Sequence, residues 1–440
     1  MTRKLTDDEY VAEKVHGHYF REVTVENLRC FGKRQTLRLA NKENQPYHWT
    51  IILGENGAGK TTLLKTLVGV APSPKTLFSR TQTIRLYPGL EDWNRQWDTS
   101  RMDSTSPSVI GADIVAARTL TKPIAGGDLH LEVKDKHVGS PSIVYNDDSY
   151  AKLGDFLCFA YGASRRMGSA SLSSDVFSTA SVSLFDDDAP LINVEDFFMQ
   201  ADYEAKTSGT KDSLEQRAKV KRLLVEVLPD VSDLRISKTP PLRVEVKTPF
   251  GWVRLADLSL GYKSLIAWVV DFGSRMFHYH RTMKNPFHAP AVVLVDEIDL
   301  HLHPAWQRKI LGYLSKRFPN TQFIATAHSP LIVQAALNAN LVLLKRRGSQ
   351  VMIDNAPDVI KNWRIDQILT SDIFGLSSAR SEDAEKLLVQ RRKLLLRPKL
   401  TKTDVKKLDR LEEQLGPLPV AETSEYIEAM KIIQKAATRA

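Results

Sequence analysis

The alternation of apolar and polar residues predicts a chain in which strands and helices follow one another. Residues 20–40 alternate around Gly32, which predicts two antiparallel strands joined by a turn. The apolar run at residues 51–53 predicts a buried strand, and the helix expected over residues 63–70 ends before two prolines. A chain that begins in this way is typical of an α/β fold.

The rest of the chain continues to mix strands, loops and helices. Residues 75–150 are rich in strands and loops, with candidate strands at 83–87 and 130–133. The later elements that we expect are a strand at 156–160, helices over 193–228, a strand at 242–247, a helix over 257–283, a buried parallel strand at 291–297, a helix over 306–318, a strand at 321–327 and a charged helical tail from 381. The chain has no sustained heptad pattern, so long coiled-coil arms are not expected.

Changes in this pattern divide the chain into four predicted regions. The N-terminal lobe covers residues 1–190 and includes a β-rich insertion, and a helical insertion covers 191–240. A second α/β lobe covers 241–345, and a helical C-terminal region covers 346–440. The length of 440 residues is sufficient for a sizeable core.

The segment from Gly54 to Thr62 carries the clearest chemical signature. It matches GxxxxGK[ST] between an apolar strand and a helix, and therefore predicts a phosphate-binding P-loop. The glycines let successive main-chain N–H groups converge on phosphate oxygens, and the helix directs its positive end there. Lys60 supplies a cation for the β- and γ-phosphates, and Thr61 supplies a hydroxyl ligand for Mg²⁺. The residues expected to bind the nucleotide are Gly54, Asn56, Gly57, Gly59, Lys60, Thr61 and Thr62.

Two carboxylates follow the apolar run at residues 291–295. Open α/β sheets bind ligands at the carboxyl edge of their strands, so we expect Asp296 and Glu297 at that edge. Asp296 would hold Mg²⁺, directly or through water, and Glu297 would polarise the attacking water as a general base. The alternative is a strand that ends in surface acids, but the P-loop upstream favours the catalytic interpretation.

Two further motifs are interpreted from their positions along the chain relative to the P-loop and the acid pair. Residues 258–264 read LSLGYKS before an apolar helix, which makes Ser259 and Gly261 candidates for an anion site at a helix N-terminus. Taken alone, this motif is an ordinary helix cap. His328 follows the apolar run at 323–327 and is a candidate sensor of the γ-phosphate, although a single histidine there is more often structural.

Composition and charge narrow the class of protein without identifying it. The chain is 42% hydrophobic and 26% charged, which is typical of a globular protein. Its two cysteines exclude a disulfide scaffold and fit a reducing cytoplasm, where we expect the protein. The first residues lack the apolar segment of a signal peptide, and no apolar run approaches membrane-spanning length. The net charge of +9 permits nucleic-acid binding and is equally compatible with a solvated basic surface.

The order P-loop, LSxG, hhhhDE and strand–histidine resembles that of the ABC-type ATPase superfamily. The signature LSLGYKS, the opening VTVENLRCFGKRQTLRL and the segment DEIDLHLHPAWQ are similar to the SMC/RecF/OLD branch rather than to transporters. The resemblance implies a two-lobed head, built from a P-loop sheet and an antiparallel β subdomain, that binds ATP and Mg²⁺. It also implies a signature at 258–262, a D-loop at 299–304 that includes Asp299, and a switch histidine at 328.

In this branch two heads pair head to tail, so the resemblance implies a homodimer or a higher homo-oligomer. Ser259 of one copy would then cap the γ-phosphate that Lys60 of the other copy binds. His301 and His303 form an HxH, which we interpret as part of the D-loop rather than as a metal site.

Arg165 and Arg166 follow the strand expected at 156–160 and leave two interpretations open. They are candidates for a contact to phosphate or to the neighbouring head, and they are equally compatible with a basic turn on the surface. No glutamine is assigned to the Q-loop of the superfamily.

The chain after residue 330 contains neither a TOPRIM-type acidic triad nor an HNH motif, so an effector nuclease would be a separate subunit. The segment IDQILTSDIFGLSSARSEDAEKLL resembles ATPases of bacterial anti-phage systems, first the Septu ATPase, which works with an HNH nuclease, and second the PARIS ATPase. The resemblance implies an ATPase that regulates an HNH-type or TOPRIM-type nuclease docked on its C-terminal helices. The alternatives are a RecF-like repair factor that binds double-stranded DNA directly and, against the signature, a transporter subunit.

Overall fold

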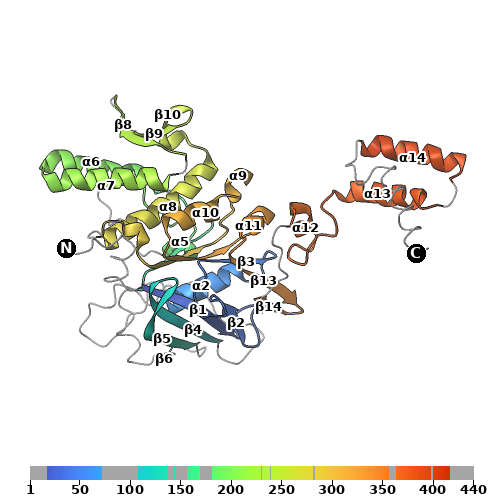
Figure 1. Ribbon diagram of the computed structural model, residues 1–440, viewed down its shortest axis with the longest axis horizontal. Helices are drawn as coiled ribbons and strands as arrows, with labels where there is room; N and C mark the ends of the chain where they lie inside the picture. Colours follow the sequence, from blue (N-terminus) through green and yellow to red (C-terminus); the bar gives the residue numbers. More distant parts are fainter. Residues whose placement is uncertain are drawn as a thin grey trace, which may run out of the picture. The chain divides into compact units, whose positions relative to one another are not determined.

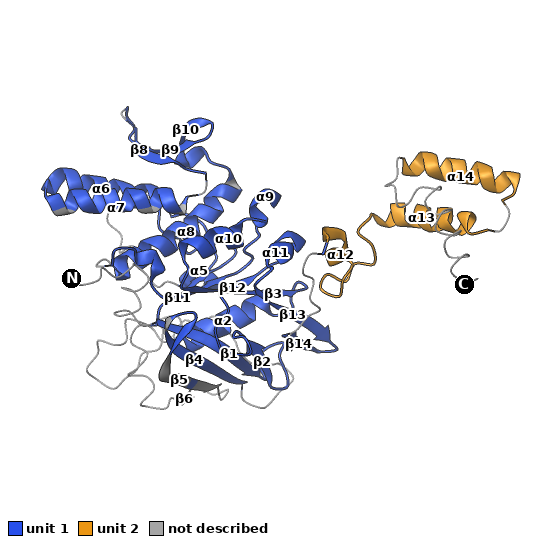
Figure 2. Cartoon of the chain, viewed as in Figure 1, with its two compact units in different colours: residues 1–363 blue, residues 364–440 orange. Residues whose placement is uncertain are grey.

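The computed structural model describes residues 17–71, 108–135, 142–144, 156–168, 181–228, 230–237, 239–280, 283–355, 363–397 and 400–416. The chain divides into two compact units, residues 1–363 and residues 364–440 (Figure 2). The first unit extends past the boundary predicted at residue 345, and the divisions at residues 190 and 240 stay predictions. The candidate strand at 83–87 lies outside the described residues.

A six-stranded sheet forms the centre of the first unit (Figure 1). Its strand order is β14-β13-β3-β12-β11-β7, and every neighbouring pair is parallel except β13 and β14. The strands are β3 (Trp49–Gly54), β7 (Cys158–Tyr161), β11 (Ala291–Val295), β12 (Thr321–Thr326), β13 (Asn340–Arg347) and β14 (Gln350–Asp354). The buried parallel strand predicted before the acid pair is confirmed, because every residue of β11 is buried between two parallel neighbours.

An antiparallel sheet of order β2-β1-β4-β5-β6 forms a second layer. Its strands are β1 (Gly17–Glu26), β2 (Gln35–Arg38), β4 (Ser108–Thr119), β5 (Lys122–Asp135) and β6 (Ser142–Val144). The helix α2 (Lys60–Val70) lies between the two sheets, and buried apolar residues from all three layers form one core (Figure 1). The predicted combination of a P-loop sheet and an antiparallel β subdomain is therefore confirmed.

Helices cover the opposite face of the six-stranded sheet. Phe272 of α8 (Leu260–Tyr279) packs against Phe159 of β7 and Phe323 of β12, with ring centroids 5.2 and 6.4 Å apart. Phe318, just after α10 (Ile310–Arg317), completes this aromatic cluster. The shorter elements are α5 (Val182–Phe185), α9 (Pro304–Gln307), α11 (Pro330–Ala335) and the 3-10 turns η2 (Leu255–Asp257) and η3 (Pro286–His288). The aromatic cluster fixes α8 against the strands that carry the candidate site.

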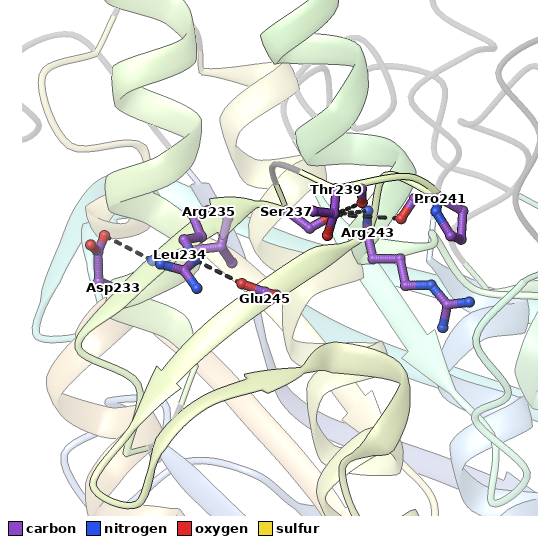
Figure 3. Close-up of polar contacts among 8 residues, drawn as sticks. All are labelled: Asp233, Leu234, Arg235, Ser237, Thr239, Pro241, Arg243 and Glu245. Atoms are coloured by element: carbon purple, nitrogen blue, oxygen red, sulfur yellow. Dashed lines mark hydrogen bonds and ion pairs between the residues drawn. The ribbon is translucent and has the colours of Figure 1, made fainter.

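A helical hairpin and a small sheet separate α5 from α8. The helices α6 (Val194–Ser208) and α7 (Lys211–Val227) confirm the helical segment predicted over 193–228. An antiparallel sheet of β8 (Asp233–Ile236), β9 (Val244–Thr248) and β10 (Gly251–Arg254) follows. Arg235 pairs with Glu245 across β8 and β9 at 2.7 Å, and the Ser237 hydroxyl donates to the Thr239 carbonyl at 3.2 Å. Figure 3 shows both pairs of residues. The turn η2 then leads from β10 directly to Ser259.

Side chains near the start of β12 join the two large sheets. The Gln322 amide donates to the Phe20 carbonyl at 2.7 Å and accepts from the Phe20 N–H at 2.9 Å. The Tyr19 hydroxyl donates to the Asn320 carbonyl at 2.7 Å. Residues about 300 positions apart along the chain are therefore part of one fold.

The described part of the second unit consists of α12 (Ile365–Leu369), α13 (Glu382–Leu395) and α14 (Lys402–Leu415). The buried guanidinium of Arg391 on α13 contacts Glu412 on α14 at 2.9 Å. The helical tail predicted from residue 381 is confirmed as far as α14. Among the residues described in the two units, no helix is long and apolar enough to cross a membrane.

Candidate active site

The turn between β3 and α2 has the strand–loop–helix form predicted for a P-loop. Its backbone takes φ angles of 148° at Gly54, 76° at Gly57 and 84° at Gly59, which residues with a Cβ adopt only with strain. Asn56 lies exposed at the tip of this loop, and Thr62 is buried in the first turn of α2. The glycine pattern thus permits the sharp entry into a helix whose N-terminus faces the loop.

Lys60 is the cation of the loop and is only 7% exposed. Its ammonium donates to the carbonyls of Gly54 and Glu55 at 2.8 and 2.9 Å, so the side chain folds back over the loop. Burial lowers the pKa of Lys60, and nearby acids, first Asp296, oppose that change. The lysine is therefore held among oxygen atoms at the carboxyl edge of the sheet.

A continuous chain of hydrogen bonds joins the P-loop helix to the acid pair. The Thr61 hydroxyl donates to one carboxylate oxygen of Asp296 at 2.7 Å. The Thr326 hydroxyl donates to the other oxygen at 2.5 Å and accepts from the Glu297 N–H at 2.7 Å. Thr326 is fully buried at the end of β12, and sequence reasoning missed it.

The donor set of Thr61 and Asp296 fits Mg²⁺. This ion takes oxygen ligands and binds proteins through one or two carboxylates together with substrate phosphates and water. The Thr61 hydrogen is donated to Asp296, which leaves the lone pairs of the hydroxyl oxygen available to a cation. These two residues could therefore hold the metal beside the phosphates of a nucleotide on Lys60.

Glu297 has a left-handed backbone, with a φ of 48° that is unusual for a residue with a side chain. Its N–H is bonded to Thr326, and its carbonyl accepts a 2.6 Å hydrogen bond from Nη2 of Arg165. The structure thus separates the two arginines that the sequence left open. Arg165 is buried beside Glu297, whereas Arg166 is exposed and pairs with Asp188.

Asp299 and His328 meet at the same edge through the backbone. The Asp299 carboxylate accepts from the His328 N–H at 3.1 and 3.2 Å. Gln307 links the segment of Asp299 to the segment of His328. Its side-chain amide donates to the Asp299 carbonyl at 3.2 Å and accepts from the Ser329 hydroxyl at 2.7 Å. Asp299 was predicted to bind the nucleotide, and in this structure its carboxylate holds the turn that carries His328. Gln307 was missed, because nothing in its local sequence distinguishes it from a surface glutamine.

The signature residues lie at the N-terminus of α8, beside the D-loop. A Cβ at Gly261 would lie 1.9 Å from the His301 carbonyl oxygen, so only glycine permits this approach. Ser259 occupies the cap position and is exposed, but its side chain makes no capping hydrogen bond. The ordinary role of a helix cap therefore does not account for its hydroxyl. His303 caps α9, with Nδ1 accepting from the Ala305 N–H at 3.3 Å.

Comparison with known proteins identifies the class of domain. Residues 131–334 match the family described as "AAA domain, putative AbiEii toxin, Type IV TA system", and residues 22–70 match an AAA domain family. The first match includes the signature, the acid pair and His328, and the second includes the P-loop. Both families are defined by AAA domains, so the motifs and the matches agree.

Two relatives and one solved structure extend this comparison. The chain is 25% identical over 436 residues to the Septu protein PtuA of Bacillus mycoides (strain KBAB4), a match that covers 94% of this chain and 54% of that protein. It is 34% identical over 131 residues to the "Retron Vc95 probable ATPase" of Vibrio cholerae serotype O1 biovar El Tor, covering 30% of this chain and 26% of that protein. The SMC head domain from Thermotoga maritima aligns with a TM-score of 0.40 at 13% identity, over 76% of this chain and 98% of that one.

The chain spans about half the length of the Septu relative. The resemblance to the Septu ATPase predicted from the motifs is nevertheless confirmed. Residues 22–70 and 131–334 thus match AAA domain families, and the chain is similar to the Septu protein PtuA and to a retron ATPase.

Proposed function

We propose that this chain hydrolyses ATP with Mg²⁺, that two copies pair head to tail around the nucleotide, and that the assembly regulates a separate nuclease subunit in bacterial anti-phage defence. The observation that carries the proposal is the hydrogen-bonded chain from Thr61 through Asp296 and Thr326 to Glu297. It supports the proposal because the predicted phosphate loop, the predicted metal ligands and a carboxylate lie together at one edge of a sheet, which is the arrangement that phosphoryl transfer to water requires.

Each residue of this edge has a role in the proposal. The P-loop N–H groups and Lys60 bind the phosphates, and Thr61 and Asp296 hold the metal. Bound Mg²⁺ would neutralise charge that develops on the phosphate oxygens. Glu297 orients and deprotonates the attacking water, and His328 contacts the γ-phosphate. The fixed hydrogen bonds of Asp296 support this assignment, because preorganised groups need no rearrangement during the reaction.

The proposed second half of the site is Ser259 of another copy. The serine is exposed at the positive end of a 20-residue helix, and its hydroxyl is not used to cap that helix. A γ-phosphate held by the P-loop of the other copy would accept hydrogen bonds from the Ser259 hydroxyl and from the N–H groups at the start of this helix. ATP would then join two copies, and hydrolysis would release them.

The proposed role in defence rests on the relation to the Septu protein and to a retron ATPase. The Septu resemblance implies a nuclease of the HNH type, and a TOPRIM-type nuclease is the second candidate. We place the docking of this nuclease on the C-terminal helices α13 and α14, where Val389 and Val405 are exposed apolar side chains.

The test is affinity capture of Glu297→Gln from cells that carry the neighbouring genes, with Mg²⁺ and ATP present. We expect an increase in assembly mass that depends on ATP, together with a co-purifying nuclease identified by mass spectrometry. The matched control adds Lys60→Ala to the same chain and should lose both. Capture of DNA and further copies without a nuclease would replace the defence role by a RecF-like repair role. An unchanged assembly mass would refute the composite site.

A further inference from the structure

Arg165 is a buried cation to which the proposed chemistry assigns no role. It lies in the loop after β7, has a left-handed φ of 40° and is 3% exposed. The neighbouring Arg166 has the same chemistry but stays at the surface. Burying a guanidinium is unfavourable unless its environment compensates, so the inward position of Arg165 requires a physical reason.

The contacts of Arg165 provide that reason. Nη2 donates to the Glu297 carbonyl at 2.6 Å, and Nε donates to the Ala163 carbonyl at 3.4 Å. Burial lowers the pKa of Arg165 to about 10, while Asp296, Asp299 and Glu297 favour the charged form. The guanidinium is thus hydrogen-bonded to main-chain oxygens, and the negative charges of the three nearby acids stabilise its positive charge.

The backbone of Glu297 needs such support. The left-handed region is unfavourable for a residue with a side chain, which keeps it only where its surroundings enforce it. Two side chains hold this peptide, Thr326 at the N–H and Arg165 at the carbonyl. A shift of this backbone would move the carboxylate relative to the water that it is proposed to activate.

The loop that carries Arg165 is itself fixed at its base. The Tyr161 carbonyl accepts from the Asp296 N–H at 2.8 Å. The Tyr161 hydroxyl donates to Asp271 at 2.8 Å, and Asp271 is fully buried on α8, where it also pairs with Arg275 at 2.7 Å. Arg165 therefore extends from a rigid junction between the acid-bearing strand and the signature helix.

We propose that Arg165 is a positioning residue for hydrolysis, which acts by holding the Glu297 peptide in its left-handed conformation and not by binding ATP. The inference rests on the proposed function, because it assigns the general-base role to Glu297. This proposal predicts that kcat and KM respond differently to the loss of Arg165. Loss of the guanidinium should lower the rate of the chemical step and leave nucleotide affinity and assembly intact.

The experiment compares Arg165→Gln with Arg166→Gln in steady-state ATP hydrolysis with saturating Mg²⁺. We expect kcat to fall about 10- to 100-fold for the Arg165 variant, with the KM for ATP changed less than about twofold. The Arg166 variant removes an equivalent charge from the surface and should behave as the unsubstituted chain. A raised KM with an unchanged kcat would show a contact to the nucleotide and overturn the proposal.

Two additions separate positioning from folding and from assembly. The first is Arg165→Lys, which keeps the charge but lacks the guanidinium fork. It should lower kcat several-fold at unchanged KM even if Arg165→Gln fails to fold, and an unchanged kcat would overturn the proposal. The second combines Arg165→Gln with Glu297→Gln, and ATP-dependent assembly should persist there. Its loss in the double variant alone would assign Arg165 to the interface, whereas failure of Glu297→Gln to assemble would count against the composite site instead.

Discussion

Thr326 offers the most direct test of the site, because one buried hydroxyl serves both acids. Thr326→Val keeps the shape of the side chain and removes the hydrogen bond to the Asp296 carboxylate and the one from the Glu297 N–H. A hydrogen bond to a charged group contributes about 1.5–3 kcal/mol, and one between neutral groups contributes about 0.5–1.5 kcal/mol. The variant should therefore lose roughly 2–4.5 kcal/mol of interaction free energy that orients the two acids.

This loss converts into a rate through the transition-state relation. If the hydrogen bonds act in the transition state, about 1.4 kcal/mol corresponds to a factor of ten, so kcat should fall roughly 30- to 2000-fold. Thr326→Ser is the matched control, since it keeps the hydroxyl and removes one methyl group. It should lose about 1 kcal/mol of unfolding free energy and keep kcat within a few-fold.

The assay is phosphate release at saturating Mg²⁺ and ATP, with denaturant unfolding of each variant measured in parallel. The Val variant should also unfold more easily than the Ser variant, because the Asp296 oxygen and the Glu297 N–H are left without this partner. If the Val and Ser variants have equal kcat values, the hydrogen-bonded chain does not organise catalysis, and the assignment of Glu297 loses its structural support.

The remaining predictions concern the signature. Lys60→Ala and Ser259→Arg should each abolish hydrolysis alone, but an equal mixture should recover about a quarter of the original rate. Half of randomly paired dimers would be mixed, and each would contain one intact site of two; no recovery would contradict head-to-tail pairing. Gly261→Ala should abolish ATP-dependent assembly measured by mass photometry, because its Cβ would lie 1.9 Å from the His301 carbonyl oxygen. Gly312→Ala is the control, since its Cβ would meet no atom within 4 Å, and an assembly defect of equal size there would refute this reason.

Structural features that depend on residues close together in the sequence were predictable. The P-loop needs glycines, a lysine and a threonine in one short segment, and the acids directly follow the strand that positions them. Strands β3, β11 and β12 contain short apolar runs, and β1 and β2 pair antiparallel as predicted, so pattern and structure agree. The local sequence was therefore sufficient to predict the P-loop, the acid pair and these strands.

Features that depend on contacts between distant segments were not predictable. Thr326 resembles any other β-branched residue of a buried strand, and its role arises because β12 brings it beside Asp296. Arg165 and Arg166 are the same residue type in sequence, and only the fold determines which one is buried. Strands β13 and β14 are a different case, because a Gly348 turn between two short runs that contain apolar residues is a hairpin signal, and we predicted a helical region from residue 346 instead.

The order of strands in the central sheet has a consequence for the synthesis of the protein. The strand that leads into the P-loop is hydrogen-bonded between β12 and β13, so residues 49–54 have no sheet partners until residues 321–326 are made. At about 5–20 residues per second, a ribosome takes roughly 14–54 s to cover that interval. During this time the nascent strand has two open edges, which is a situation that chaperones manage. The loop that we propose to bind the nucleotide and the acids that we propose to act on it are thus joined in one sheet only late in synthesis, and an incomplete chain is expected to stay inert toward ATP.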